Sequence, residues 1–125
     1  MTYELARRLR SQDRPPAPGT EPAARVAERA RVYRLRPRRV PLGRVVATPG
    51  ALDLAGSHGL DLLDLLLRHE TGDWGDVCAG DARANDRALA VGARVLSAYD
   101  TAGGRVWVIT EADRSATTVL LPSEY

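Results

Sequence analysis

Two hydrophobic periodicities divide the chain near residue 92, and their order limits what the chain can fold into. Between residues 49 and 91 the apolar residues recur at helical spacing, most densely in the leucine-rich stretch LLDLLLRH at residues 62–69. Three later segments have the pattern of strands: residues 94–99, 105–111 and 117–121. Because helices and strands do not alternate, a parallel doubly wound sheet is disfavoured. We predict an α+β fold, in which helices are followed by a three- to four-stranded antiparallel meander and pack on one face of the sheet.

Residues with strong end preferences mark the boundaries of these elements. Residues 44–48 are a fourth strand candidate, after which Thr48 is a helix N-cap and Pro49 the first helical residue. The loop TAGG at residues 101–104 predicts a hairpin with a four-residue connection. The predicted helices run from Pro49 to about residue 57, from residue 62 to His69 with Asp61 as its N-cap, and from about Ala79 to Val91, with Gly59 and Gly92 ending two of them.

The charge is divided between a basic first segment and an acidic remainder. Residues 1–40 hold 11 Arg and 4 acids, a net charge of +7, whereas residues 41–125 hold 7 Arg and 12 acids, a net of −5. We predict a basic, Arg-rich arm over residues 1–40, with a Pro-rich linker at residues 13–22, and a compact α+β domain over residues 41–125. Within the arm, residues 3–10 could form two helical turns and residues 23–34 a basic helix.

This asymmetry suggests an acidic partner, and nucleic acid is the usual one. A second interpretation remains open. All 18 basic residues are Arg and none is Lys, which together with abundant Ala, Gly, Pro and Val is typical of codon choice in a GC-rich genome.

Composition also argues against several classes of protein. A single cysteine, Cys78, rules out an internal disulfide, and no apolar run approaches the roughly 20 residues of a membrane span. The first residues do not resemble a secretory signal, so we expect no membrane partner and a cytoplasmic location. One Cys and two separated His do not make a zinc ligand set, and no phosphate-binding glycine motif is present, so we expect neither metal nor cofactor.

His69 is the first candidate for chemistry. It lies in the last turn of the leucine-rich helix, where the helix dipole favours a protonated imidazole, and Glu70 or Asp73 could orient it. It could serve as a general acid or base or contact a phosphate. The alternative is a structural role, in which the imidazole bonds to a carbonyl at the helix end.

The loop and helix after His69 hold three further candidates. Asp73 and Trp74 lie in the loop TGDWGD, where Trp74 could stack on a base or, as we favour, fill the edge of the core. Asn85 is a poor helix former within a helix, which predicts a hydrogen bond to a neighbouring loop, for example residues 71–75.

Trp107 is a further candidate, on the predicted strand at residues 105–111. It points to the strand face opposite Val106 and Val108, and it marks a binding face if that side is exposed.

A last group of polar residues lies on the predicted strands and their turn. Small hydroxyls and an arginine beside a sheet can bind a phosphate diester, with the arginine stabilising developing charge and a His or Tyr moving protons. The alternative is that Ser and Thr simply favour strands and that a local ion pair stabilises the turn at residues 111–114. The group comprises Ser97, Tyr99, Thr110, Arg114, Thr117 and Thr118.

Several of these motifs together resemble a small family of bacterial proteins carried on plasmids and integrative elements. The shared motifs are TPGAL at residues 48–52, RH at 68–69, GDWG at 72–75, Asn85, SAY at 97–99 and ITEADRSATT at 109–118. Members are often labelled plasmid-related or modification subunit of a type I restriction enzyme. This chain has no S-adenosylmethionine loop and no amino-methyltransferase motif, so the resemblance implies no methylation. The resemblance to this family does not cover residues 1–40.

At the level of fold the pattern also resembles the barnase–colicin–RelE group of small ribonucleases. That likeness implies His69, Arg114, Ser97 and Thr118 as catalytic residues.

Two hypotheses follow. The first is a non-enzymatic accessory or interaction protein of mobile elements that docks on a protein or nucleoprotein partner, with possible nucleic-acid contact through the Arg-rich arm. The second is a metal-independent ribonuclease that uses His69 and Arg114. The binding residues expected under the first are Asp73, Trp74, Asn85, Tyr99, Trp107 and Thr110.

Overall fold

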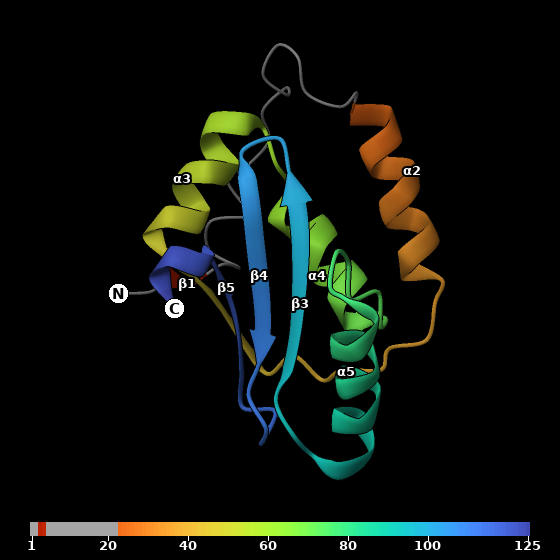
Figure 1. Ribbon diagram of the computed structural model, residues 1–125. Helices are drawn as coiled ribbons and strands as arrows, with labels where there is room; N and C mark the ends of the chain where they lie inside the picture. The colour runs from red at the N-terminus through yellow and green to blue at the C-terminus, as the bar shows by residue number, and fades with distance from the viewer. Residues whose placement is uncertain (1–2, 5–22) are drawn as a thin grey trace.

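Helices precede a strand meander, as predicted (Figure 1). The computed structural model describes residues 3–4 and 23–125. No helix within these residues is long and apolar enough to cross a membrane. The elements are β1 (Tyr3–Glu4), α2 (Ala23–Arg34), β2 (Arg44–Ala47), α3 (Pro49–His58), α4 (Leu62–Glu70), α5 (Ala79–Val91), β3 (Val95–Thr101), β4 (Gly104–Thr110), β5 (Ala116–Leu120) and the 3₁₀ turn η1 (Pro122–Glu124).

The strands form one five-stranded sheet in the order β1-β2-β5-β4-β3. The meander β3–β4–β5 is antiparallel, as predicted. The strand predicted at residues 44–48 is β2. It departs from the predicted antiparallel arrangement because it pairs in parallel with β5, Arg44 lying opposite Ala116 and Ala47 opposite Val119. The helices carry the chain from β2 to the far edge at β3, and the meander then returns to β2. The class is therefore α+β with a mostly antiparallel sheet.

One face of the sheet forms the core with the helices. Its valines Val106, Val108 and Val119 are fully buried with Leu62 of α4 and Ala51 of α3. Figure 1 shows α4 behind β3 and β4, while α5 lies along the free side of β3. The prediction that helices pack on one face of the sheet is confirmed.

The predicted helix ends are also present. Thr48 accepts a hydrogen bond from the amide of Ala51 and Asp61 from that of Leu63, as N-caps do. Gly59 and Gly92 end their helices in the left-handed region, with φ of 62° and 73°.

Two boundaries differ from the sequence-based interpretation. Tyr3–Glu4, in a stretch that could form two helical turns but is too short to persist alone as a helix, is extended and pairs with β2, because pairing with a strand avoids the unfavourable nucleation of a short isolated helix. The hairpin between β3 and β4 has two connecting residues, since Thr101 pairs with Gly104. The predicted linker at residues 13–22 lies outside the described residues, whereas the basic helix is present as α2 and lies against α4.

Candidate functional site

His69 is entirely buried between α4 and the sheet. Its exposed fraction is 0%, as are those of Ser97, Thr110 and Thr117. Its Nδ1 lies 2.6 Å from Ser97 Oγ and its Nε2 lies 2.8 Å from Thr110 Oγ1. The structure thus brings three predicted site residues together, but inside the core and away from solvent.

The bonds around His69 have one consistent direction. Thr117 donates to the carbonyl of Leu42 at 2.7 Å, so its oxygen accepts the hydroxyl of Thr110 at 2.7 Å. Thr110 must then accept from Nε2–H of His69, which leaves Nδ1 to accept from Ser97. All donors in this series of bonds are used, so the network ties α4 to β3, β4 and β5.

The helix dipole does not keep the imidazole of His69 protonated. Burial, together with the nearby positive charge of Arg114, lowers the pKa of His69 from 6.5 to about 4. Desolvation outweighs the helix dipole because the ring has no contact with water. Neither Glu70 nor Asp73 orients the ring, which Ser97 and Thr110 hold instead.

The other two residues of the ribonuclease hypothesis do not join His69. Arg114 donates to the carbonyls of Ala88 and Ala93 at 3.1 and 2.7 Å, and so caps the C-terminal end of α5. It also bonds the carbonyl of Glu111, in place of the expected local ion pair. Thr118 alternates with buried Thr117 on β5, so it points to the opposite face of the sheet. The four residues do not converge on one cleft.

The loop TGDWGD covers the free edge of β3. The amide of Ala98 donates to the carbonyl of Trp74 at 3.1 Å, and the carboxylate of Asp76 accepts from the amide of Asp100 at 2.8 Å. A Cβ at Gly75 would collide with the carbonyl oxygen of Ala98, so the close approach requires glycine. The loop thereby protects an edge strand from unwanted pairing.

Asn85 completes this cover, though with a different partner from the one predicted. Its side-chain amide donates to the carbonyl of Leu96 at 2.8 Å and accepts from the Leu96 amide at 3.1 Å. The predicted hydrogen bond to the loop is made instead by the neighbouring residue Asp86, whose carboxylate accepts from the indole of Trp74 at 3.2 Å. Asn85 reaches β3 directly because α5 lies beside that strand.

The two tryptophans have different environments. Trp74 is 6% exposed and packs in the core with Val40, Ala88 and Val95, as the favoured interpretation predicted. Trp107 is partly exposed on the sheet face opposite α4, with its ring centroid 5.7 Å from that of Tyr125. Figure 1 shows no described helix over the front of β3 and β4, where this face lies.

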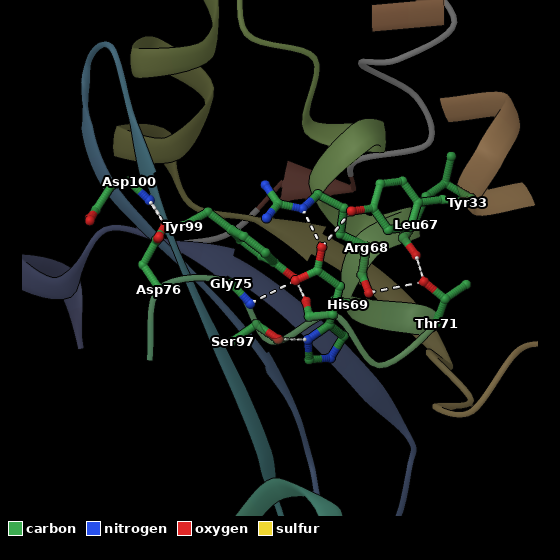
Figure 2. A network of polar contacts seen from close by, with 11 residues as sticks. Tyr33, Leu67, Arg68, His69, Thr71, Gly75, Asp76, Ser97, Tyr99 and Asp100 are labelled. Atoms are coloured by element: carbon green, nitrogen blue, oxygen red, sulfur yellow. Dashed lines mark hydrogen bonds and ion pairs between the residues drawn. The ribbon is translucent and has the colours of Figure 1, made fainter. Parts of the chain in front are cut away.

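The best candidate for a functional site lies where α2 meets the end of α4 (Figure 2). One carboxylate oxygen of Asp73, Oδ2, accepts from the hydroxyl of Tyr33 at 2.6 Å and from Nε of Arg68 at 2.9 Å. The other, Oδ1, accepts from the amide of Gly75 at 3.0 Å. The hydroxyl of Tyr99 donates to the backbone carbonyl of Asp73 at 2.7 Å. We call Tyr33, Arg68, Asp73 and Tyr99 the Asp73 cluster.

Two arginines lie over the tyrosine rings of this cluster. The guanidinium carbon of Arg68 is 4.6 Å from the ring centroid of Tyr99, and that of Arg36 is 4.5 Å from the ring centroid of Tyr33. Both distances are typical of cation–π contact. Two arginine–tyrosine pairs, from different parts of the chain, therefore adjoin one aspartate: Arg68 and Tyr33 bond its carboxylate, and Tyr99 bonds its backbone carbonyl.

The electrostatics of the cluster favour its charged form. Burial opposes the charge of Asp73, but hydrogen bonds from Arg68 and Tyr33 hold its pKa below the ordinary value. Burial likewise opposes the charge of Arg68, yet the bond and charge of Asp73 raise its pKa. Burial and the carboxylate both raise the pKa of Tyr33.

The segment that carries Tyr33 into this cluster is rich in arginine. Residues 23–40 contain seven arginines and one glutamate. Two of these arginines also pair with the body: Arg38 Nε lies 2.7 Å from Glu70, and Arg39 lies 3.7 Å from Asp86. The arginines whose exposure is described are all exposed: Arg25, Arg31, Arg34, Arg36, Arg38 and Arg39.

Sequence reasoning missed part of this cluster. It assigned no role to Tyr33, Arg36 or Arg68, although Arg68 stands beside His69 in the RH motif. A usable signal was the aromatic Tyr33 within a basic helix, because such a ring needs a surface to pack on.

Nothing in the described residues holds a metal, since they contain no group of three or more His, Cys, Asp or Glu placed to bind one. Comparison with protein-family models, with curated proteins and with solved structures finds no match.

Proposed function

We propose that this chain is an accessory binding protein that docks on a nucleoprotein and contacts its nucleic acid through the arginine-rich segment at residues 23–39. One observation carries the proposal. The six arginines of known exposure in this segment all face solvent, and the segment is attached to an otherwise acidic body. A dense, exposed positive surface supplies the phosphate contacts on which nucleic-acid affinity depends.

Charge separation gives the proposal its geometry. The body, residues 41–125, has a net charge of −5, so nucleic acid would be repelled from most of its surface and drawn to α2. The resemblance to proteins of plasmids and integrative elements is consistent with an accessory role near DNA or RNA.

A ribonuclease receives less support from the geometry. His69 has no exposed surface and a pKa near 4, and Arg114 is occupied by backbone carbonyls. A general base must reach the proton that it removes, and His69 would need the core to open first.

Salt dependence of binding tests the proposal. Affinity of the full chain for a short nucleic-acid duplex is measured by fluorescence anisotropy at several salt concentrations. Replacing Arg25, Arg31 and Arg34 with Gln should weaken binding and reduce the slope of log K against log salt by about 0.9 for each phosphate that the variant no longer neutralises.

A charge-matched control separates location from net charge. Arg44, Arg83 and Arg87 are exposed arginines of the body, and replacing all three with Gln removes the same charge. That variant should keep the wild-type slope. Equally weakened binding in both variants, or no binding by the wild type, would reject the proposal.

A further inference from the structure

We propose that the two arginine–tyrosine pairs of the Asp73 cluster, Arg68 on Tyr99 and Arg36 on Tyr33, form a specific site for a backbone phosphate of nucleic acid. This inference rests on the proposed function and names the residues that recognise the phosphate group itself. The site differs from the rest of the arginine-rich surface because its guanidinium groups are held in place.

Arg68 is the central residue of the site. Its Nε is bonded to Asp73 and its guanidinium carbon lies 4.6 Å from the ring centroid of Tyr99, so two contacts hold the guanidinium in position. No contact described within residues 23–125 uses Nη1 or Nη2 of Arg68. Figure 2 shows these two terminal nitrogens pointing away from the bond that Nε makes. Its side chain is 25% exposed, so the remaining donors can be reached from solvent.

The available donors suit a phosphate. Nη1 and Nη2 form a planar fork that binds two oxygens of a phosphate at once, which a lysine ammonium cannot do. Because Nε already neutralises Asp73, the carboxylate does not compete for the fork. Arginine that is already positioned loses little side-chain entropy when it binds.

Arg36 extends the same site. Its guanidinium carbon lies over the ring of Tyr33, whose hydroxyl shares the Asp73 Oδ2 atom with Nε of Arg68. The positive charges of both guanidinium groups oppose the rise in the pKa of Tyr33 that burial and Asp73 produce. Arg36 is exposed, so the pair can contact adjacent oxygens of one nucleic-acid strand.

The acidic groups nearest the site are already paired. Asp73 is bonded to Arg68, Glu70 to Arg38, and Asp100 to Arg105. Asp76, in the nearby loop, differs because its described partner is not an arginine: its carboxylate accepts a hydrogen bond from the amide of Asp100. This pairing limits the repulsion that a bound phosphate would meet.

Lysine substitutions separate a geometric site from a general positive charge. Arg68→Lys and Arg36→Lys keep the charge but remove the planar fork of donors. The probe is the short duplex of the previous experiment, at fixed salt, with the full chain. Each variant should bind roughly tenfold more weakly, with an unchanged salt slope, whereas Arg87→Lys and Arg105→Lys, at exposed arginines outside the arginine-rich segment, should bind as the wild type does.

A second measurement covers the case in which Arg68→Lys does not fold. In the wild type, the Nε–H of Arg68 is hydrogen-bonded to Asp73 and is observable by NMR. Titration with inorganic phosphate should shift this resonance in a saturable way, and Arg36→Lys should weaken the titration.

The outcomes distinguish the two proposals. Wild-type affinity in both lysine variants, with weaker binding by the Arg25, Arg31 and Arg34 variant, would overturn the phosphate site and leave the proposed function standing. Phosphate binding at Arg68 without any nucleic-acid binding would overturn the proposed function and this assignment of its ligand. Weaker binding by the lysine variants, with a saturable phosphate titration, supports the site.

Discussion

At the scale of single residues, His69 shows how a residue chosen for its chemistry can instead hold a core together. Its two ring nitrogens bond Ser97 and Thr110, and the series of bonds continues through Thr117 to the carbonyl of Leu42. The side chains in this series are buried from water, so each bond removed would leave a buried polar atom without a partner. The network fixes the position of α4 on the sheet.

This burial predicts a loss of stability in mild acid. The pKa of His69 is about 4 in the folded chain and near 6.5 when unfolded, so the unfolded state binds more protons between these values. Stability should therefore fall as the pH is lowered through this window. Between pH 7 and pH 4.5 the free energy of unfolding should drop by about 2 kcal/mol, as measured by urea denaturation.

Exposed His58 provides the control for that prediction. A His58→Gln variant should lose as much stability as the wild type over the same pH range, because His58 is exposed. The measurement stops at pH 4.5 because protonation of Glu124 and Asp73, whose pKa values are lowered in the folded chain, adds its own loss in stronger acid. A free energy of unfolding that is constant from pH 7 to pH 4.5 would contradict a neutral, buried His69.

At the scale of elements, the last residues of the chain cap a helix far away in sequence. The carboxylate of Glu124 accepts from Thr48 at 2.5 Å, from the amide of Gly50 at 3.1 Å and from the amide of Leu121 at 2.9 Å. It thus places a negative charge at the N-terminus of α3, where the helix dipole favours one. A Cβ at Gly50 would lie 2.7 Å from this carboxylate, so any larger residue there would displace the Glu124 side chain from the cap.

Removing the charge of Glu124 should destabilise the fold modestly. Glu124→Gln leaves one oxygen to serve three donors and removes the favourable charge, so we expect a loss of about 1 kcal/mol. Urea denaturation should show a lower midpoint with an unchanged slope. Glu111→Gln, at an exposed glutamate beyond β4, is the matched control and should have little effect. Equal stability of the two variants would show that the cap contributes nothing.

The cover on the β3 edge gives a prediction of its own. Asn85→Ala removes both hydrogen bonds to the backbone of Leu96, so the Leu96 amide should exchange with solvent faster. The amide of Ala98 is bonded to Trp74 and should keep its protection. Hydrogen exchange by NMR measures both in one sample. An unchanged Leu96 amide would mean that Asn85 is not what protects this strand.

Much of the element order could be predicted from the sequence, because it depends on local signals. Thr48, Asp61 and Gly92 act within their own turns, and their roles as caps were predicted correctly. The parallel pairing of β2 with β5 was not predicted, since it joins segments that are distant in sequence and leaves no local trace.

The site was harder to predict for the same reason. His69 could be recognised as unusual, but its partners Ser97 and Thr110 lie on two strands whose register is set by the whole sheet. Tyr33 and Asp73 meet across 40 positions of sequence. Polar residues near one another in sequence, such as Asp73 and Asn85, were placed in one group although they bond different segments.

At the scale of the whole molecule, the chain joins a basic helix to an acidic body. Helix α2 lies against α4, and Tyr33 bonds Asp73 at 2.6 Å. The other α2 residues of known exposure, including Arg25, Glu28 and Val32, are exposed. Among the side chains of α2 that the structure describes, Tyr33 is therefore the one that bonds the body, and its hydroxyl can be removed without altering the core.

Tyr33→Phe tests this attachment. The variant keeps the ring that lies under Arg36 but loses the hydrogen bond to a charged acceptor, which contributes on the order of 1.5 kcal/mol. That amount corresponds to a roughly tenfold larger population with α2 released from the body. Trypsin cuts after arginine, so cleavage at Arg31 and Arg34 should become about tenfold faster, while the thermal midpoint of the body changes little.

Tyr125→Phe is the matched control, since it removes the same hydroxyl from an exposed tyrosine on the other side of the sheet from α4. It should leave the cleavage rate at α2 unchanged. If Tyr33→Phe is cleaved no faster than this control, α2 is held by contacts other than the Asp73 bond. If instead the body melts at a lower temperature together with faster cleavage, α2 belongs to the cooperative core, and the basic arm and the acidic body are one folding unit.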